Sequence, residues 1–372
     1  MLKKLEQLGK YLLALVAAPL LWRPWRRRNA EARLRAAGRI LLVRIDDRVG
    51  EVLLLTPLLA TLRTRARPPT VHVLVHPRAA RILEGHPAAD AVIPFDRRGL
   101  WRGPWCPAFR QLREAQYDVV VDCGNWSVPS VTHALVARLA GPHAAVVGPA
   151  VWPTGALHTH PVPPRADTRR EVLQRVHLLS PLDGLSPVYQ MSVAPRPADP
   201  ALEALLEAVR ETPHAVVNPG GRLGYRRVPP EVFAAAARAL LRAGRRPVVT
   251  WGPGEEGLAR FVAEAAPGAL LAPATTLDDL AALFAAAGLT VCNNTGPMHL
   301  SVAVGAPTLQ LFLHMDPVRW GHPDPPHRVL DLTPVAASPE EMCARVEAAI
   351  PAFVRAVAHD RAGPGPRHGR RS

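Results

Sequence analysis

The 372-residue sequence is poor in cysteine and in aromatic side chains, which make up only 5% of it. The cysteines are scattered, and none of them forms a C-x-x-C pair or stands with histidines at zinc-ligand spacing: Cys106, Cys123, Cys292 and Cys343. We therefore expect neither a disulfide framework nor a metal site, and a reducing, cytoplasmic compartment is the natural one.

The amino-terminal segment lacks a hydrophobic run long enough to cross a membrane. Its apolar stretch, 11–22, is too short, because a bilayer needs about 20 residues. The basic run 23–28 stands where a signal-peptide cleavage site should lie, which argues against export. Basic residues beside leucine and tryptophan suit a peripheral helix on the anionic inner face of the cytoplasmic membrane. For residues 1–38, this attachment and a disordered or self-packed extension both stay open.

The positive charge of the chain is concentrated at its two ends. The formal net charge is +14, of which residues 1–39 carry +8 and residues 360–372 carry +3. The body of the chain is therefore only weakly basic and does not require a nucleic-acid-binding face. We expect no nucleic-acid partner, and a disordered basic tail over 360–372.

Short apolar runs alternate with helical stretches twice along the chain, which predicts an α/β protein with parallel, doubly wound sheets. Expected strands are 39–45, 71–75, 91–94, 117–122, 144–148, 215–218, 246–250, 289–293 and 308–312. Expected helices include 51–65, 130–140, 230–243, 255–265, 277–287 and 296–304. The predicted organisation is two Rossmann-like domains, 39–185 and 213–335, facing across a cleft, with a proline-rich linker at 186–212 and a closing helix at 336–359.

The segment 293–299, Asn-Asn-Thr-Gly-Pro-Met-His, stands between an expected strand and an expected helix. Pro297 falls in the first helical turn, where its missing N–H costs nothing. The amides and the dipole of such a helix start can bind phosphate, with Thr295 adding a hydroxyl donor and His299 pointing back over the same turn. An ordinary helix cap made by Asn or Thr is the alternative.

A second loop, 218–227, carries three glycines and three arginines after an expected strand. Gly220 and Gly221 allow the backbone to approach a diphosphate closely, and an arginine fork can bind its oxygens. The alternative is a solvated basic loop.

A third loop, after the first expected strand, holds Asp46, Asp47 and Glu51. It is not G-x-G-x-x-G, so a nicotinamide dinucleotide site there has little support. A carboxylate at this edge can deprotonate an acceptor hydroxyl. The alternative is that Glu51 is a first-turn acid that favours the helix dipole.

These motifs resemble those of glycosyltransferase family 9, the heptosyltransferases of lipopolysaccharide core assembly. The family's first loop, which runs from an arginine to G-D-V-L-L-x-T-P, is similar to residues 44–57. Its D-T-G-P-M-H-L-A-x-A-x-G-x-P is similar to 294–307, and its H-P-G and K-R-W-P are similar to 218–220 and 226–229. The resemblance covers about residues 39–335.

The resemblance implies an inverting, metal-independent transfer of heptose or a related sugar onto a lipopolysaccharide-type or other glycan or lipid-linked acceptor. No cofactor is implied, since the ADP-linked sugar is itself a substrate. Glu51 matches the family's general base, and Arg226 matches the basic residue at the leaving diphosphate. The other implied donor-binding residues are Gly220, Gly221, Asn294, Thr295, Gly296, Pro297, Met298, His299 and, at the nucleoside, Glu255.

Three of these positions differ from the family's usual residues. Glu51 replaces Asp, Arg226 replaces Lys, and Asn294 replaces Asp. The substitutions favour a second hypothesis, a non-catalytic or altered-specificity binding or scaffold protein on the same fold. Such a protein would keep the donor pocket or a remnant of it, and its amino-terminal segment would recruit it to membrane-bound partners.

Overall fold

The computed structural model describes residues 25–96, 107–194, 196, 199–210 and 212–362. Of the expected membrane-surface segment 1–38, residues 1–24 lie outside these residues, whereas 25–36 form a helix in which Ala30 and Leu34 are buried. Of the expected tail 360–372, residues 363–372 lie outside them. The chain divides into two compact units, Met1–Ala194 and Pro195–Ser372. The expected linker 186–212 is shared between them: Val188 bonds to Thr61 in the first unit, and α9 (Pro200–Arg210) belongs to the second.

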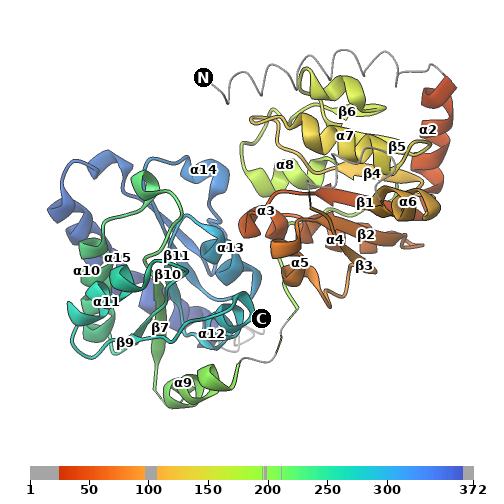
Figure 1. The fold of residues 1–372 in the computed structure, drawn as a ribbon. Helices are drawn as coiled ribbons and strands as arrows, with labels where there is room; N and C mark the ends of the chain where they lie inside the picture. Colours follow the sequence, from red (N-terminus) through yellow and green to blue (C-terminus); the bar gives the residue numbers. More distant parts are fainter. Residues whose placement is uncertain (1–24, 97–106, 195, 197–198, 211, 363–372) are drawn as a thin grey trace, which may run out of the picture. The chain divides into compact units, whose positions relative to one another are not determined.

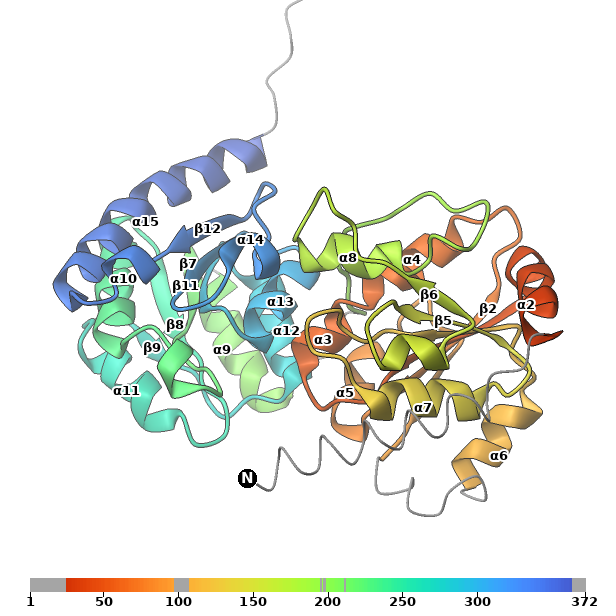
Figure 2. The same ribbon diagram turned by 90° about the horizontal axis from the view of Figure 1, so that it is seen from above.

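The first unit contains one six-stranded sheet in which every pairing is parallel (Figure 1). Its order is β3-β2-β1-β4-β5-β6. The strands are β1 (Arg39–Arg44), β2 (Thr70–Val75), β3 (Ala91–Pro94), β4 (Val119–Asp122), β5 (Ala145–Pro149) and β6 (His160–Val162). Figure 2 shows α6 and α7 on one side of this sheet and α4 and α8 on the other.

The helices of the first unit follow the expected alternation with one break. They are α2 (Trp25–Ala36), α3 (Val49–Leu53), α4 (Thr56–Arg63), α5 (Pro77–Leu83), α6 (Pro107–Glu114), α7 (Val131–Ala140), the 3₁₀ turn η2 (Thr154–Leu157) and α8 (Glu171–His177). The single helix expected over 51–65 is wrong, because α3 and α4 are separate. Pro57 has no N–H for the carbonyl of Leu53, and the hydroxyl of Thr56 donates to that oxygen instead, at 2.8 Å.

The second unit repeats the architecture with the order β12-β11-β10-β7-β8-β9. Its strands are β7 (His214–Asn218), β8 (Arg246–Val249), β9 (Leu270–Leu271), β10 (Thr290–Asn293), β11 (Thr308–Phe312) and β12 (Arg328–Asp331). Its other elements are α10 (Pro230–Arg242), α11 (Glu256–Glu264), α12 (Leu277–Ala286), α13 (Gly296–Ala303), α14 (Pro317–Trp320), α15 (Pro339–Ala362), and the 3₁₀ turns η3 (Gly224–Arg226) and η4 (Thr333–Val335).

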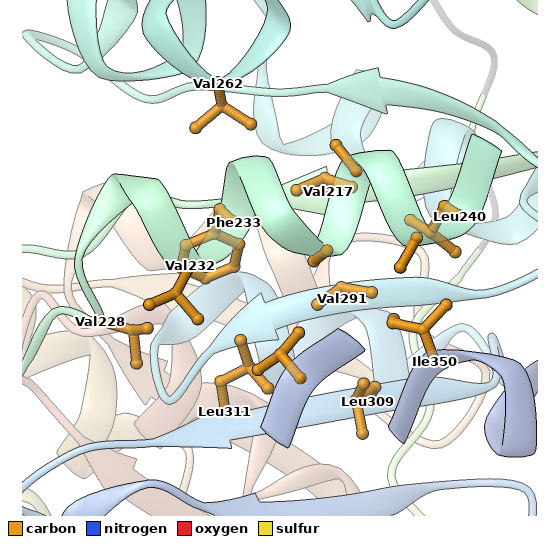
Figure 3. Packing of buried hydrophobic residues seen from close by; sticks show 14 of the residues in the cluster. Val217, Val228, Val232, Phe233, Leu240, Val262, Val291, Leu309, Leu311 and Ile350 are labelled. Atoms are coloured by element: carbon orange, nitrogen blue, oxygen red, sulfur yellow. The ribbon is translucent and has the colours of Figure 1, made fainter. Parts of the chain in front are cut away.

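One face of the second sheet packs against α10, α11 and α15 (Figure 3). Phe233 and Leu240 of α10 meet Val217 and Val291 of the sheet, and Ile350 of α15 closes the same cluster. All five side chains are fully buried. This apolar layer holds the strands whose carboxyl ends carry the sequence motifs.

Each sheet reverses its strand order at one point. The reversal lies between β1 and β4 in the first unit and between β7 and β10 in the second. Ligands of open α/β sheets bind outside the carboxyl ends of the strands at such a point. The three sequence motifs follow β1, β7 and β10, so each of them lies at a reversal.

Several short elements have no counterpart among the expected ones. They are β6, β9, β12, α8 and α14, none longer than seven residues. Three of them are strands at or near a sheet edge, where the alternating pattern is too short to be recognised. Among the described residues, no helix is long and apolar enough to span a membrane.

The packing in Figure 3 predicts unequal costs for two phenylalanine truncations. Phe233→Ala empties a fully buried position and should lower the free energy of unfolding by about 3–5 kcal/mol. Phe261→Ala is the matched control, because that side chain is 43% exposed on the adjacent α11 and should cost well under half as much. Urea denaturation followed by circular dichroism measures both, and equal costs would contradict the packing described.

Candidate functional site

Three loops of the second unit converge at the carboxyl ends of β7, β8 and β10; we call them the three-loop site. They are 219–227, 250–255 and 294–295. The Glu255 carboxylate accepts from the amides of Gly221, at 2.7 Å, and Gly252, at 3.2 Å. A Cβ at Gly220 would lie 2.1 Å from Oε2 of Glu255, and one at Gly221 would lie 3.1 Å from Cγ2 of Thr295. The site therefore brings together Gly220, Gly221, Glu255 and Thr295.

Asn293 ties two of these loops together. Its side-chain oxygen accepts from the amide of Val228 at 3.0 Å, and its Nδ2 donates to the carbonyls of Pro219 and Gly220. The residue is 1% exposed, so these bonds are shielded from water. Asn293 was expected as the end of a strand and the first residue of the 293–299 motif, but no role in joining the loops was expected for it. The signal that could have identified that role is an amide side chain closing an otherwise apolar run.

The start of α13 carries the Thr-Gly-Pro motif. Thr295 is the N-cap in extended conformation, but its hydroxyl donates to the carbonyl of Asn293 and makes no capping bond to the helix. Asn294, Gly296 and Pro297 are half-buried beside it. A chain of buried hydroxyls, Thr290 to Ser301 at 2.6 Å and Ser301 to Thr308 at 2.8 Å, anchors the helix to the sheet.

The last two residues of the motif face the interior. Met298 is fully buried. His299 is 6% exposed, and its Nδ1 lies 2.9 Å from Nε2 of His322. The backbone of His322 is in turn held by both ends of the Gln310 amide. The structure thus places these two side chains beneath the helix start rather than at its surface.

Arg226 lies in η3 and is half-buried. Its guanidinium carbon is 5.1 Å from the centre of the Tyr225 ring. Its Nε is buried without a hydrogen-bond partner in the described part of the chain. A buried donor without a partner is costly, and an anion in the three-loop site is one group that can satisfy it.

In the first unit, Glu51 lies in α3 and is 5% exposed. Its Oε2 is 2.7 Å from Nη2 of Arg44 and 2.6 Å from Nη2 of Arg175. Its Oε1 has longer contacts, 3.3 Å to Nη1 of Arg48 and 3.5 Å to Nδ2 of Asn125. A carboxylate surrounded in this way is held in its charged form and in one orientation.

Further charges extend this cluster across the strand ends. Nε of Arg44 lies 2.8 Å from Asp46, and Nε of Arg175 lies 2.8 Å from Glu171. Burial opposes the charge of Arg175, but Glu51 and Glu171 hold its pKa above the ordinary value. We call these residues the carboxylate–arginine cluster: Arg44, Asp46, Arg48, Glu51, Glu171 and Arg175.

Two buried histidines, His133 and His158, lie next to this cluster. Burial, reinforced by the charge of Arg44, lowers the pKa of His133 to about 4, and its Nε2 accepts from the amide of Ile45. Burial alone would raise the pKa of Asp122, but the hydrogen bond from His158, at 3.0 Å, and its charge hold that pKa below the usual value. Of the carboxylate–arginine cluster, the sequence motifs contained Arg44, Asp46, Arg48 and Glu51. Residues from β4, α7 and α8 join them only through the fold.

Comparison with known proteins identifies the family of this chain. The family model described as glycosyltransferase family 9 (heptosyltransferase) matches residues 105–349. The chain belongs to this family. The expectation drawn from the sequence motifs is thereby confirmed, and the protein is a glycosyltransferase.

Individual relatives of this family 9 member include lipopolysaccharide heptosyltransferase 3 of Escherichia coli, 27% identical over 73% of the chain and 82% of the relative. A family 9 structure from Veillonella parvula covers 88% of the chain and 98% of its own, with a TM-score of 0.72 and 19% identity. The E. coli heptosyltransferase WaaC with ADP covers 86% and 99%, with a TM-score of 0.65 and 21% identity. The two structures support the fold, which is of the GT-B type.

One glycine pattern went unrecognised in the sequence. Gly252, Gly254 and Gly257 follow β8 with the spacing G-x-G-x-x-G. In a dinucleotide-binding domain this pattern follows a strand at the reversal of strand order, whereas β8 lies one strand away from it. Gly254, with a φ of 81°, serves the turn that brings Glu255 to Gly221.

The buried, neutral His133 predicts a pH dependence of stability in this family 9 protein. Its folded-state pKa lies below the unfolded value of about 6.5, so the unfolded chain takes up the proton first as the pH falls. Its contribution to the free energy of unfolding should therefore be full above pH 6.5 and decrease by roughly 3 kcal/mol on acidification to pH 4.

Urea denaturation of wild type and His133→Gln at pH 7 and pH 4 measures this contribution as the change in their stability difference. His143→Gln, at an exposed histidine, is the control and should show no such change. A stability difference between wild type and His133→Gln that is the same at both pH values would refute the assignment.

Proposed function

We propose that the protein is an inverting, metal-independent transferase that moves heptose or a related sugar from an ADP-linked donor to a lipopolysaccharide-type or other glycan or lipid-linked acceptor. The observation that carries the proposal is the three-loop site, where glycines, arginines and a helix start meet at the strand reversal of the second unit. The proposal is supported by relatives described as a lipopolysaccharide heptosyltransferase and as a heptosyltransferase with ADP.

The donor is held by the three-loop site in this proposal. Gly220 and Gly221 let the loop after β7 pass close to Glu255 and Thr295, and the start of α13 with Asn294, Thr295, Gly296 and Pro297 faces the oxygens of the diphosphate. Met298 and His299 support that helix start from below. Glu255, which already holds the Gly221 amide, orients the loop at the nucleoside. Arg226 neutralises the charge that develops on the diphosphate as it leaves.

The acceptor hydroxyl is activated by Glu51. The oxygen of the acceptor hydroxyl attacks the anomeric carbon from the face opposite the diphosphate, and the proton of that hydroxyl passes to Glu51. The bond between the anomeric carbon and the diphosphate oxygen breaks in the same step. One displacement inverts the configuration. The arginines of the three-loop site supply the positive charge that this step needs, so the mechanism requires no metal ion.

The acceptor and its location follow from the same proposal. A lipid-linked acceptor at the cytoplasmic face of the membrane suits the basic and apolar sequence of residues 1–28. The binding-only hypothesis shares the fold and the donor pocket, and a transfer assay with ADP-linked sugars separates the two.

Replacing the base tests the enzymatic role directly. Glu51→Gln keeps the size of the side chain but cannot take a proton, so kcat should fall by about 10²–10⁴ while ADP affinity stays within twofold of wild type. The readouts are release of ADP in the presence of an acceptor and calorimetric titration with ADP. Glu114→Gln, at an exposed acid of α6, is the matched control. Undiminished turnover in Glu51→Gln would remove Glu51 from the mechanism.

Replacing Arg226 tests the donor site. Arg226→Ala removes a charge-assisted hydrogen bond to the diphosphate and should weaken ADP binding by about 10–100-fold. Arg226→Lys, which keeps the charge, should retain part of the affinity. Arg345→Ala on the exposed face of α15 serves as the control. An ADP affinity unchanged in Arg226→Ala would contradict the assignment of this loop.

A further inference from the structure

The short helix α8 buries two charged side chains that the proposed reaction does not yet use. Glu171 and Arg175 stand one turn apart, and they are 2% and 0% exposed. Burying charges is expensive unless each one is paired. Their partners therefore indicate why this seven-residue helix keeps them.

Arg175 connects two carboxylates and a main-chain oxygen. Its Nε contacts Oε1 of Glu171, its Nη2 contacts Oε2 of Glu51, and its Nη1 donates to the carbonyl of Cys123. The guanidinium plane is thus fixed at three points, one of them the strand end after β4. Because Oε2 of Glu51 is bound by Arg175 and Arg44, the Oε1 atom is the one directed toward the partly exposed Arg48.

Other charged or polar groups face Glu51 from the neighbouring elements. Arg44 comes from β1, Arg48 precedes α3, and Asn125 follows β4. Asp46 balances Arg44, as Glu171 balances Arg175. Helix α5, which packs against α3, turns only apolar side chains inward, and its arginines are exposed. Glu171 is therefore the carboxylate that offsets the charge of Arg175 on the side away from Glu51.

We propose that Arg175 is a positioning residue that directs Oε1 of Glu51 toward the acceptor hydroxyl, and that Glu171 sets the basicity of Glu51 through Arg175. The proposal rests on the proposed function, in which Glu51 takes the acceptor's proton. With Glu171 present, Arg175 shares its charge between two carboxylates. Without Glu171, the whole charge acts on Glu51 and weakens it as a base.

The test is the protonation midpoint of Glu51, measured by ¹³C NMR of the full-length protein with labelled glutamate carboxyl groups. Glu51→Gln identifies the signal. Glu171→Gln should lower the midpoint by about one pH unit, because it removes a nearby charge of the same sign as Glu51. Arg175→Gln should raise the midpoint, because it removes a nearby charge of the opposite sign. Mere loosening of α8 would shift both midpoints in the same direction.

Activity provides the second readout. The acid limb of the kcat–pH profile should move to lower pH in Glu171→Gln by the same amount as the midpoint, while the KM for the donor stays unchanged. Arg175→Lys should recover part of the kcat lost in Arg175→Gln, and in the titration it should keep the Glu51 midpoint near the wild-type value because it keeps the charge. Glu341→Gln, in the exposed i,i+4 pair with Arg345, is the matched control and should leave both readouts unchanged.

The outcomes separate this inference from the proposed function. A Glu51 midpoint that stays unchanged or rises in Glu171→Gln overturns the role of Glu171, whatever the activity. If the midpoints move as expected but wild-type protein transfers no sugar from the ADP-linked donors, the electrostatic coupling stands and the proposed function fails.

Discussion

Where successive crossovers leave a parallel sheet in opposite directions, their helices part, and the strand ends between them stay uncovered. In this protein the parting occurs between β1 and β4 and again between β7 and β10. Polar loops can reach each edge without breaking the apolar layers on the sheet faces. Both candidate sites depend on this constraint, because the motifs that follow β1, β7 and β10 all lie at such an edge.

The two edges use the opening differently. In the second unit, backbone amides, glycines and the side chains of Asn293 and Glu255 form the framework, and Nε of Arg226 is buried without a hydrogen-bond partner among the described residues. In the first unit, alternating carboxylates and guanidiniums fill the edge almost completely, and Glu51 is 5% exposed. The first arrangement suits capture of an external anion, and the second suits precise control of one internal carboxylate.

The sequence predicted the fold class and the places of the motifs because both follow from local patterns. Alternating apolar runs identify buried strands, and Thr295-Gly296-Pro297 predicts the start of a helix because proline is favoured in the first helical turn. The roles of Asn293 and Arg175 could not be predicted, because their partners, the loop after β7 and Glu51, are distant in the chain. Glu171 is only four residues from Arg175, but its effect on Glu51 depends on that same distant contact. The break between α3 and α4 was predictable in principle from Pro57, but leucine-rich periodicity across it masked the signal.

The close approach of Gly220 to Glu255 means that substitutions at these two positions, 35 residues apart, depend on each other. A side chain at 220 would displace the Glu255 carboxylate from the amides of Gly221 and Gly252, so a larger residue there is better tolerated once the acid at 255 has been shortened or lost. The residues at positions 220 and 255 are therefore expected to covary within the family, so that a change of the glycine accompanies a change of the glutamate. A homologue that breaks the pairing would need a different way to anchor the loop after β7.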